Sequence, residues 1–258
     1  MGAYFEPLGD GVYRPTPASG GAWNDDEIHF SPLGGLLVHA MDQHRDDDGS
    51  RKALGRISFD ILGMVPFDDC TIGVETTRAG RTIELVEAVA VVRGRRVATA
   101  RAWFVSPVDT GAVAAGAPNR MPPSDTAQLW PMDKFWSGGY VASLEVRALE
   151  PPLAGRARVW IRSSVDLVED EVCSTHASYI ALVDTANGIA VRENPSRWMF
   201  PNLDLTIHLH RQPVGEWIGL DTTVVFGPTG LGITSSVLYD ASGAVGRSEQ
   251  ALTVRPVE

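Results

Sequence analysis

The sequence has little cysteine: its 258 residues include Cys70 and Cys173, which lie far apart along the chain. Neither belongs to a CxxC pair or to another metal-binding spacing, which argues against a disulfide framework and against a zinc motif. We expect two buried thiols that pack as small hydrophobic side chains in a reducing compartment.

The sequence also lacks an excess of basic residues and any long apolar run. Its 22 Lys and Arg against 32 Asp and Glu give a formal net charge of -10, which argues against a nucleic-acid groove and against docking on anionic membranes by charge. No apolar run approaches the roughly 20 residues of a membrane span, and residues 1–17 show no signal-peptide pattern. We therefore expect a soluble cytoplasmic protein with no nucleic-acid or membrane partner.

Sequence motifs of several enzyme classes are missing. There is no GxSxG elbow and no P-loop, so nothing supports a serine hydrolase or a nucleotide-phosphate site. The acidic run at 46–49 lacks the alternating oxygen ligands of a calcium loop and is expected to be solvated. His208 and His210 alternate on an expected strand and, with His176, form a candidate metal cluster, but no further ligand has a fitting spacing. We expect no metal.

The sequence does contain many β-type segments, arranged twice around a helical segment. Their alternation and β-branched content favour antiparallel strands. Expected hairpin turns include 78–80, 93–95 and 240–243. The expected strands lie within 55–67, 70–94, 95–107, 140–149, 155–164, 203–211, 216–227, 231–240 and 244–254.

A stretch rich in Ala, Gly, Pro and Ser separates the two sets of strands. It runs over 108–139 and is too long for a tight turn, so we expect a linker that packs along a surface. The expected division is an N-terminal unit at 1–107, the linker, and a C-terminal unit at 140–258 that carries the catalytic residues.

The first expected helix begins at Ser31. A serine can cap the helix with its side chain, and Pro32 suits the first helical position, where a missing N–H costs nothing. Gly34 and Gly35 follow in the first turn, although glycine costs roughly 1 kcal/mol relative to alanine in a helix. We expect the absence of a side chain at these two positions to have a function.

The second expected helix spans 167–187 and ends at Gly188, which suits a C-terminal cap. Its apolar stripe, at spacings of four and three, consists of Val172, His176, Ile180 and Val183. A helix and an antiparallel meander, present twice, predict a duplicated α+β unit. We expect two antiparallel sheets joined side by side around two long central helices.

Three polar residues lie where the apolar pattern would allow an apolar side chain. They are Asp184 near the end of the second helix, Asn202 before a strand and Gln250 on the last strand. From the pattern alone they are also compatible with an exposed helix-end carboxylate, a turn residue and a solvated edge glutamine.

At this point the sequence resembles a known family. The segments SPLGGLLVHA, GRISFDILGMVPF, VETTRAGRTIELVEA, NLDLTIHLHRQP and GRSEQALTV are similar to those of double-hotdog acyl-CoA thioesterases of the thioesterase II type, in particular the actinobacterial thioesterase-like branch. The resemblance extends from about Trp23 to Arg255. It implies a tandem hotdog fold and a thioester hydrolase of lipid metabolism that acts on fatty or branched acyl-CoA.

The resemblance also implies the site. In this family an Asp, a hydroxyl or amide residue and a Gln hold a water against the thioester carbonyl, and these positions fall on Asp184, Asn202 and Gln250. Asn202 departs from the hydroxyl of better-known members. Gly34 and Gly35, at a helix start, are expected to contribute to substrate binding or to the oxyanion hole.

The resemblance further implies water attack without an acyl-enzyme or a cofactor, and a homodimer or higher homo-oligomer. The last strand of the first half offers Arg101 and Trp103 where the second half has Gln250, so we expect one working site per chain.

Two alternative functions stay open. One is a non-catalytic acyl-CoA or lipid-binding protein, because a fold does not fix a function. The other is an enoyl-CoA hydratase or dehydratase, whose Asp/His pair is not apparent because no histidine closely follows Asp184.

Overall fold

The computed structural model describes residues 2–24, 26–46 and 52–257. Within these ranges, fourteen strands form one continuous sheet and two short strands form a separate ladder. Most of the acidic run expected to be solvated at 46–49 lies outside the described residues. None of the described helices has the length and apolar character needed to cross a membrane.

The N-terminal half of the chain supplies one side of the sheet, in the order β1-β2-β4-β5-β6-β3. The hairpins between its strands follow the alternation of the sequence, which places one face of each strand in the core. The strands are β1 (Ala3–Gly9), β2 (Val12–Pro15), β3 (Ala53–Ile61), β4 (Cys70–Arg78), β5 (Ile83–Val92) and β6 (Arg95–Val105).

The C-terminal half supplies the other side, in the order β12-β15-β14-β13-β9-β8-β7. One of its strands, β10 (Asp166–Val168), instead pairs in parallel with β1 at the far edge of the N-terminal side. The remaining strands are β7 (Gln128–Leu129), β8 (Leu144–Ala148), β9 (Arg156–Ser163), β12 (Asp204–Leu209), β13 (Ile218–Phe226), β14 (Leu231–Asp240) and β15 (Gly243–Thr253), with the separate ladder formed by β11 (Trp198–Met199) and β16 (Arg255–Pro256).

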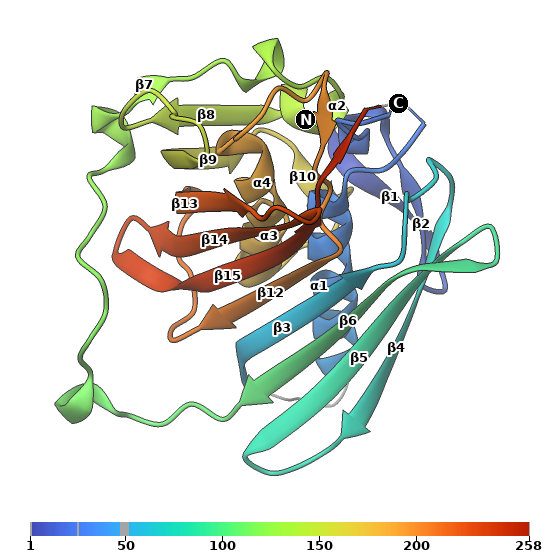
Figure 1. Ribbon diagram of the computed structural model, residues 1–258. Helices are drawn as coiled ribbons and strands as arrows, with labels where there is room; N and C mark the ends of the chain where they lie inside the picture. Colours follow the sequence, from blue (N-terminus) through green and yellow to red (C-terminus); the bar gives the residue numbers. More distant parts are fainter. Residues whose placement is uncertain (1, 25, 47–51, 258) are drawn as a thin grey trace.

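The two sides join where β3 and β12 pair in antiparallel fashion. Phe59 lies opposite Leu205 and Ile57 lies opposite Ile207, and all four side chains are buried. Because this junction is hydrogen-bonded and packed like the interior of either half, the two sheets form one curved surface (Figure 1). The α+β tandem hotdog class is confirmed.

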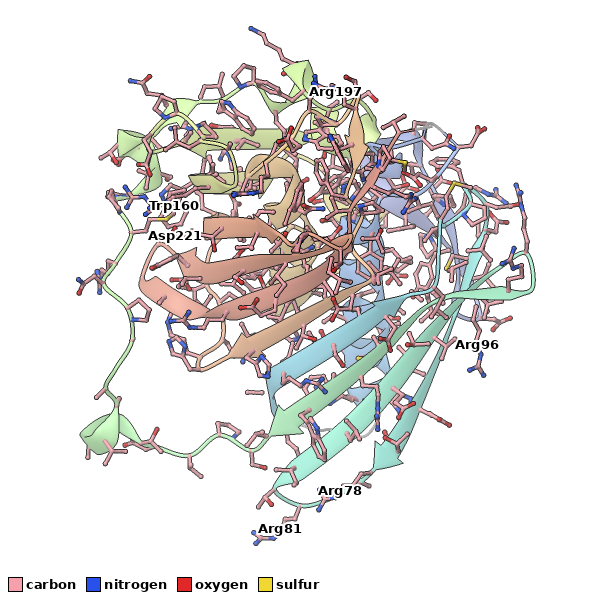
Figure 2. All side chains as sticks on the ribbon, in the orientation of Figure 1. Arg78, Arg81, Arg96, Trp160, Arg197 and Asp221 are labelled. Carbon is pink, nitrogen blue, oxygen red and sulfur yellow. The ribbon has the colours of Figure 1, made fainter. Side chains whose placement is uncertain are left out.

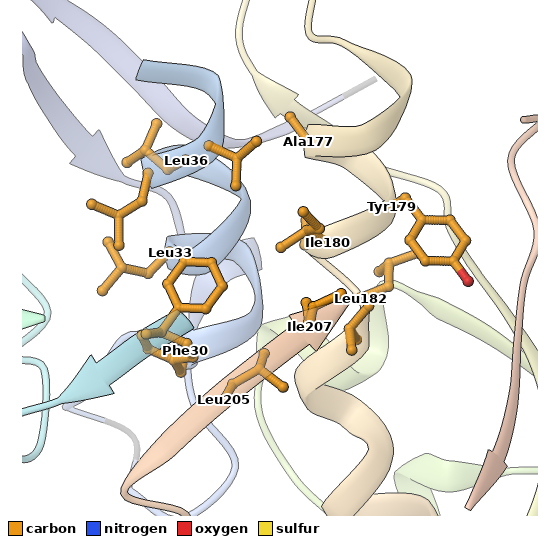
Figure 3. Close-up of a cluster of buried hydrophobic side chains, with 14 of the residues drawn as sticks. Phe30, Leu33, Leu36, Ala177, Tyr179, Ile180, Leu182, Leu205 and Ile207 are labelled. Atoms are coloured by element: carbon orange, nitrogen blue, oxygen red, sulfur yellow. The ribbon is translucent and has the colours of Figure 1, made fainter. Parts of the chain in front are cut away.

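Helices fill the concave side of this surface (Figure 1). The long helix α1 (Phe30–Asp46) packs against α3 (Thr175–Ile180), and α4 (Ala186–Ile189) lies over the sheet of the C-terminal half. Figure 3 shows the contact, with the side chains of α1 on one side, those of the α3 segment on the other and β12 below them. Its labelled residues are Phe30, Leu33, Leu36, Ala177, Tyr179, Ile180, Leu182, Leu205 and Ile207.

Gly35 makes the close approach of the two helices possible. A Cβ at this position would lie 2.5 Å from Cβ of Ala181 and 3.0 Å from the carbonyl oxygen of Ala177. Only a residue without a side chain fits between these atoms, which explains why a poor helix former is present.

The helix boundaries differ from those expected. The first helix begins at Phe30, so Ser31 is inside it and the prediction of Ser31 as N-cap is wrong. The second is not one helix over 167–187. Its first residues instead form β10, where Leu167 and Val168 are buried and the strand pairs with β1. An extended turn follows, in which Val172 is 98% exposed.

The helical part of this segment starts after Ser174, whose side chain accepts a hydrogen bond from the N–H of Ala177. It is interrupted after α3, continues as the 3-10 turn η5 (Val183–Thr185), and ends with α4. Gly188 lies within α4 and has no positive φ, so its prediction as the C-terminal cap is wrong.

The hairpin turns are confirmed at both equivalent positions. Arg93 and Gly94 have φ of 50° and 72°, the left-handed pair that a two-residue hairpin requires, and Asp240 and Gly243 close the corresponding turn. The linker runs outside the sheet from β6 to β7 (Figure 1), with Trp136 buried in the core. The division at 107 and 139 stays a prediction.

Both cysteines are free thiols, with Cys70 buried and Cys173 half-buried. Burial raises the pKa of Cys70 to about 12 and that of Cys173 to about 11, so both are protonated at neutral pH.

Candidate active site

The interruption between α3 and α4 places a carboxylate in the interior. Leu182 leaves helical geometry, with φ of −117° and ψ of −11°, and the chain re-enters a helical turn with Asp184 in its first turn. The side chain of Asp184 is buried, with 7% of its surface exposed. Burial raises the pKa of Asp184 to about 6, although hydrogen bonds from Asn202 and Gln250 oppose the shift.

The structure brings the three expected residues together. Nδ2 of Asn202 donates to Oδ1 of Asp184 at 2.7 Å, and Nε2 of Gln250 donates to the same oxygen at 2.8 Å. Asn202 is also tied to the backbone, because Nδ2 donates to the carbonyl of Asp204 at 3.0 Å. The two amides hold the carboxylate in one orientation.

Two oxygen atoms of the site accept no hydrogen bond from the described residues. Both amide donors use Oδ1 of Asp184, and no described residue donates to Oδ2. Oε1 of Gln250 is buried and also receives no hydrogen bond from the described residues. Both oxygens can accept hydrogen bonds from a water, but neither oxygen can donate a hydrogen bond to an anion.

Asp184 borders a cleft of about 710 Å³. Both halves of the chain form the cleft, and its walls are mostly apolar with few charged groups, as is typical of a ligand site. The residues that line it include Trp23, Ile28, His29, Phe30, Ile61, Leu62, Met64, Val65, Asp184, Met199, Asn202, Leu203 and Arg255. A second cavity of about 40 Å³ is lined by Asp184 as well, together with His29, Asn202 and Trp136.

The start of α1 faces the cleft through Phe30. Among the described residues, no acceptor is found for the N–H of Phe30, one of the free donors at a helix start. Gly34 and Gly35 do not line the cleft. They lie in the second turn of the helix, where each N–H donates to the carbonyl oxygen of the residue four positions earlier.

Several residues of the cleft were missed from the sequence. His29 lies directly before α1, and its Nδ1 accepts the N–H of Ser31 at 3.0 Å, so it performs the capping that was expected of Ser31. Trp23 also lines the cleft, and its ring packs edge-on against the buried ring of Phe200, with centroids 5.3 Å apart. The sequence signal for the capping role of His29 is a histidine two residues before the Ser31-Pro32 pair.

The other histidines lie elsewhere. His176 bonds to Asp42 at 2.9 Å, whereas His208 and His210 are exposed on and after β12. No group of three or more possible metal-binding side chains occurs in the part of the chain that the structure describes.

Comparisons with known proteins agree with this architecture. Residues 20–105 match the family model of the acyl-CoA thioesterase N-terminal domain, and residues 114–254 match that of the acyl-CoA thioesterase C-terminal domain. No curated protein matches the chain.

Solved structures share the fold over nearly the whole chain. A conserved protein of unknown function with a hot dog fold from Alicyclobacillus acidocaldarius has a TM-score of 0.76 and 11% identity, covering 98% of this chain and 96% of that one. An acyl-CoA thioesterase II from Mycobacterium marinum has a TM-score of 0.64 and 17% identity, with coverages of 98% and 96%. A 12:0-ACP thioesterase from Umbellularia californica has a TM-score of 0.54 and 10% identity, with coverages of 95% and 93%.

Proposed function

Since this chain belongs to the acyl-CoA thioesterase family and is a thioester hydrolase, we propose that it converts a fatty or branched acyl-CoA to the free acid and CoA. The observation that carries the proposal is the buried carboxylate of Asp184, fixed by two amides at the edge of a cleft. We further propose that water attacks the thioester directly, without an acyl-enzyme.

In the proposed reaction, Asp184 acts as the general base. The water oxygen forms a bond to the thioester carbon while Oδ2 of Asp184 takes one water proton, and the carbonyl electron pair moves onto oxygen. The tetrahedral intermediate then collapses, the C–S bond breaks, and the proton on Asp184 passes to the CoA thiolate. A base with a pKa of about 6 is largely ionised at neutral pH and still a useful proton acceptor.

Asn202 and Gln250 position the base and the water in this proposal. Each amide nitrogen donates to Asp184, and in this proposal each amide carbonyl oxygen accepts a hydrogen bond from the attacking water. Asn202 performs this role with an amide where better-known family members have a hydroxyl.

The developing oxyanion needs donors, and the free N–H of Phe30 at the start of α1 supplies one in this proposal. Gly34 and Gly35 lie too far into the helix to present a free N–H. We propose that Gly35 contributes through packing, because it lets α1 approach the segment that carries Asp184.

Basic side chains near the cleft suit the phosphates of CoA. Arg255, on β16, lines the cleft and is exposed, and Arg197 lies just before the paired strand β11. Figure 2 shows Arg197 far from Arg78 and Arg81, which lie at the opposite end of the molecule. We propose that Arg197 and Arg255 bind phosphate oxygens. A cytoplasmic location and assembly as a homodimer or higher homo-oligomer are further proposals.

Release of free thiol from a panel of acyl-CoAs, acetyl to palmitoyl, tests the function. The unmodified protein should hydrolyse some chain length, and Asp184→Asn should lose about 10²–10⁴-fold in kcat, the usual contribution of an acid–base group. Asp42→Asn, which alters a carboxylate that bonds to His176 and does not line the cleft, is the matched control. Turnover that survives Asp184→Asn would contradict the role of Asp184.

A further inference from the structure

A polar side chain from the N-terminal half faces the cleft that Asp184 borders. His29 lines both the large cleft and the small cavity beside Asp184 and Asn202. Its ring stacks on the ring of Tyr140, with centroids 4.2 Å apart and planes inclined by 29°. The stacking on one face and the hydrogen bond from Ser31 at one edge hold the imidazole in a fixed position.

The hydrogen bond from Ser31 determines which ring nitrogen carries the proton. A backbone N–H can only donate, so Nδ1 of His29 must be unprotonated, and the N–H of the neutral ring is on Nε2. Among the described residues, no acceptor is found for this Nε2–H. Burial lowers the pKa of His29 to about 3, so the ring is neutral at physiological pH.

We propose that Nε2–H of His29 donates a hydrogen bond to the thioester carbonyl oxygen of an acyl-CoA bound in this cleft, and to the oxyanion that forms from it. This inference rests on the proposed hydrolysis. It makes His29 a catalytic residue that the N-terminal half contributes to the site of the C-terminal half. The carboxylate of Asp184 offers only acceptors to the reacting atoms, so a donor at this position supplies what the base lacks.

A neutral, fixed histidine suits a donor better than a base. Nδ1 is used by Ser31, and Nε2 already carries its proton, so the ring has no nitrogen free to accept a proton from water. This state also differs from the proton-transferring histidine that an Asp/His hydratase requires. A donor that is held in place before the reaction stabilises the oxyanion without further reorganisation.

Two amide variants separate the roles of the two ring nitrogens. In His29→Asn the short side chain can replace Nδ1 as the acceptor for the N–H of Ser31, but it does not reach the position of Nε2. In His29→Gln the longer side chain can place an N–H near the position of Nε2. His29→Phe keeps the stacking on Tyr140 and removes both nitrogens.

The experiment measures kcat and KM for the acyl-CoA that the unmodified protein hydrolyses fastest, together with the melting temperature of each variant. His29→Asn and His29→Phe should lose about 10²–10³-fold in kcat, as for removal of one oxyanion donor, with a much smaller change in KM. His29→Gln should recover part of the loss. If His29 only caps and packs, His29→Asn will retain activity and exceed His29→Gln, and the inference is overturned.

Failure of this inference is distinguishable from failure of the proposed function. An unmodified protein without thiol release contradicts the hydrolysis itself, whereas turnover that depends on Asp184 but not on His29 contradicts only the inference. If a variant misfolds, the inference can still be tested by measuring the tautomer of His29 in the unmodified protein. The ¹⁵N chemical shifts of His29 should show the neutral Nε2–H tautomer between pH 5 and pH 8, and an Nδ1–H tautomer or a charged ring would overturn the inference.

Discussion

The two halves of the chain are built to the same register but differ in what their sheets present to the interior. Asp240 and Gly243 close the second long hairpin 148 positions after Val92 and Arg95 close the first. The same offset relates the bridge between Asn202 and Leu252 to the pair formed by Leu54 and Phe104. Corresponding residues of the two sheets can therefore be compared one by one.

The comparison shows which positions are polar in the second half and apolar in the first. Gln250 corresponds to Ala102 and Asn202 corresponds to Leu54, and both apolar counterparts are buried. The difference extends along the inner face of the second sheet. There Thr222, Thr234, Ser236 and Ser248 occupy the positions of Val74, Val86, Ala88 and Ala100.

The first half thus has an apolar inner face where the second half has a polar one. An apolar inner face gives stability at no cost in unpaired polar groups, whereas Oγ1 of Thr234 and Oε1 of Gln250 are buried without a partner among the described residues. Each such group needs its own explanation, which can be an ordered water, a ligand or a role in the reaction. The expectation of one working site per chain stays a prediction, and the residues used for the comparison need one correction. Arg101 points outward, and Ala102 is the inward counterpart of Gln250.

Converting the second half toward the first should have the largest effect. Gln250→Ala introduces the residue that the first half has, and it removes one of the two hydrogen bonds that orient Asp184. We expect a loss of about a hundredfold in kcat, because positioning of the base and of the water is impaired. Thiol release measures the effect.

The adjacent Glu249, whose side chain is exposed and bonds to Ser235, provides the control for Gln250→Ala. Glu249→Gln should hydrolyse acyl-CoA at the unmodified rate. Equal losses in the two variants would show that the strand, and not the amide at position 250, is responsible.

Converting the first half toward the second should destabilise the protein. Ala102→Gln places an amide in a packed apolar interior, where it meets neither Asp184 nor a cleft. Overpacking and an unpaired amide should together lower the free energy of unfolding by about 2–5 kcal/mol. Urea denaturation measures this, and Arg101→Gln on the exposed face should change it by less than about 0.5 kcal/mol. An Ala102→Gln variant as stable as the parent would show that the first half tolerates a polar interior.

The smallest effect is expected at Thr234, which faces Gln250 across the β14–β15 ladder. Thr234→Val introduces the residue found at Val86 and removes a buried hydroxyl that has no partner among the described residues. The free energy of unfolding should rise by about 1 kcal/mol with little change in kcat. A large loss of activity would instead assign Thr234 to the reaction.

Much of this fold follows from sequence pattern. Alternation of apolar and polar residues and the turn at Arg93 and Gly94 determine the strands and their register, because both depend on neighbours along the chain. The helical segment after 167 was less predictable. Its apolar spacing suits a helix, but pairing of β10 with β1, a contact between distant parts of the chain, decides its conformation.

The site, like the fold, could be predicted from the sequence in part. Asp184, Asn202 and Gln250 could be named because they match a family pattern, and the structure places them within hydrogen-bonding distance. His29 could not be found in this way, since its relation to the cleft depends on how the N-terminal half meets the C-terminal half. Gly34 and Gly35 were expected at the helix start, but the helix begins earlier and leaves Phe30 there.

The most direct test of the account is the pH dependence of kcat/KM for acyl-CoA hydrolysis. Burial raises the pKa of Asp184 to about 6, and the proposed base must be deprotonated, so activity should be low below pH 5 and rise through about pH 6 to a plateau. Activity that is constant from pH 5 to pH 8, or a rise centred near the ordinary aspartate pKa of about 4, would contradict a buried Asp184 as the base.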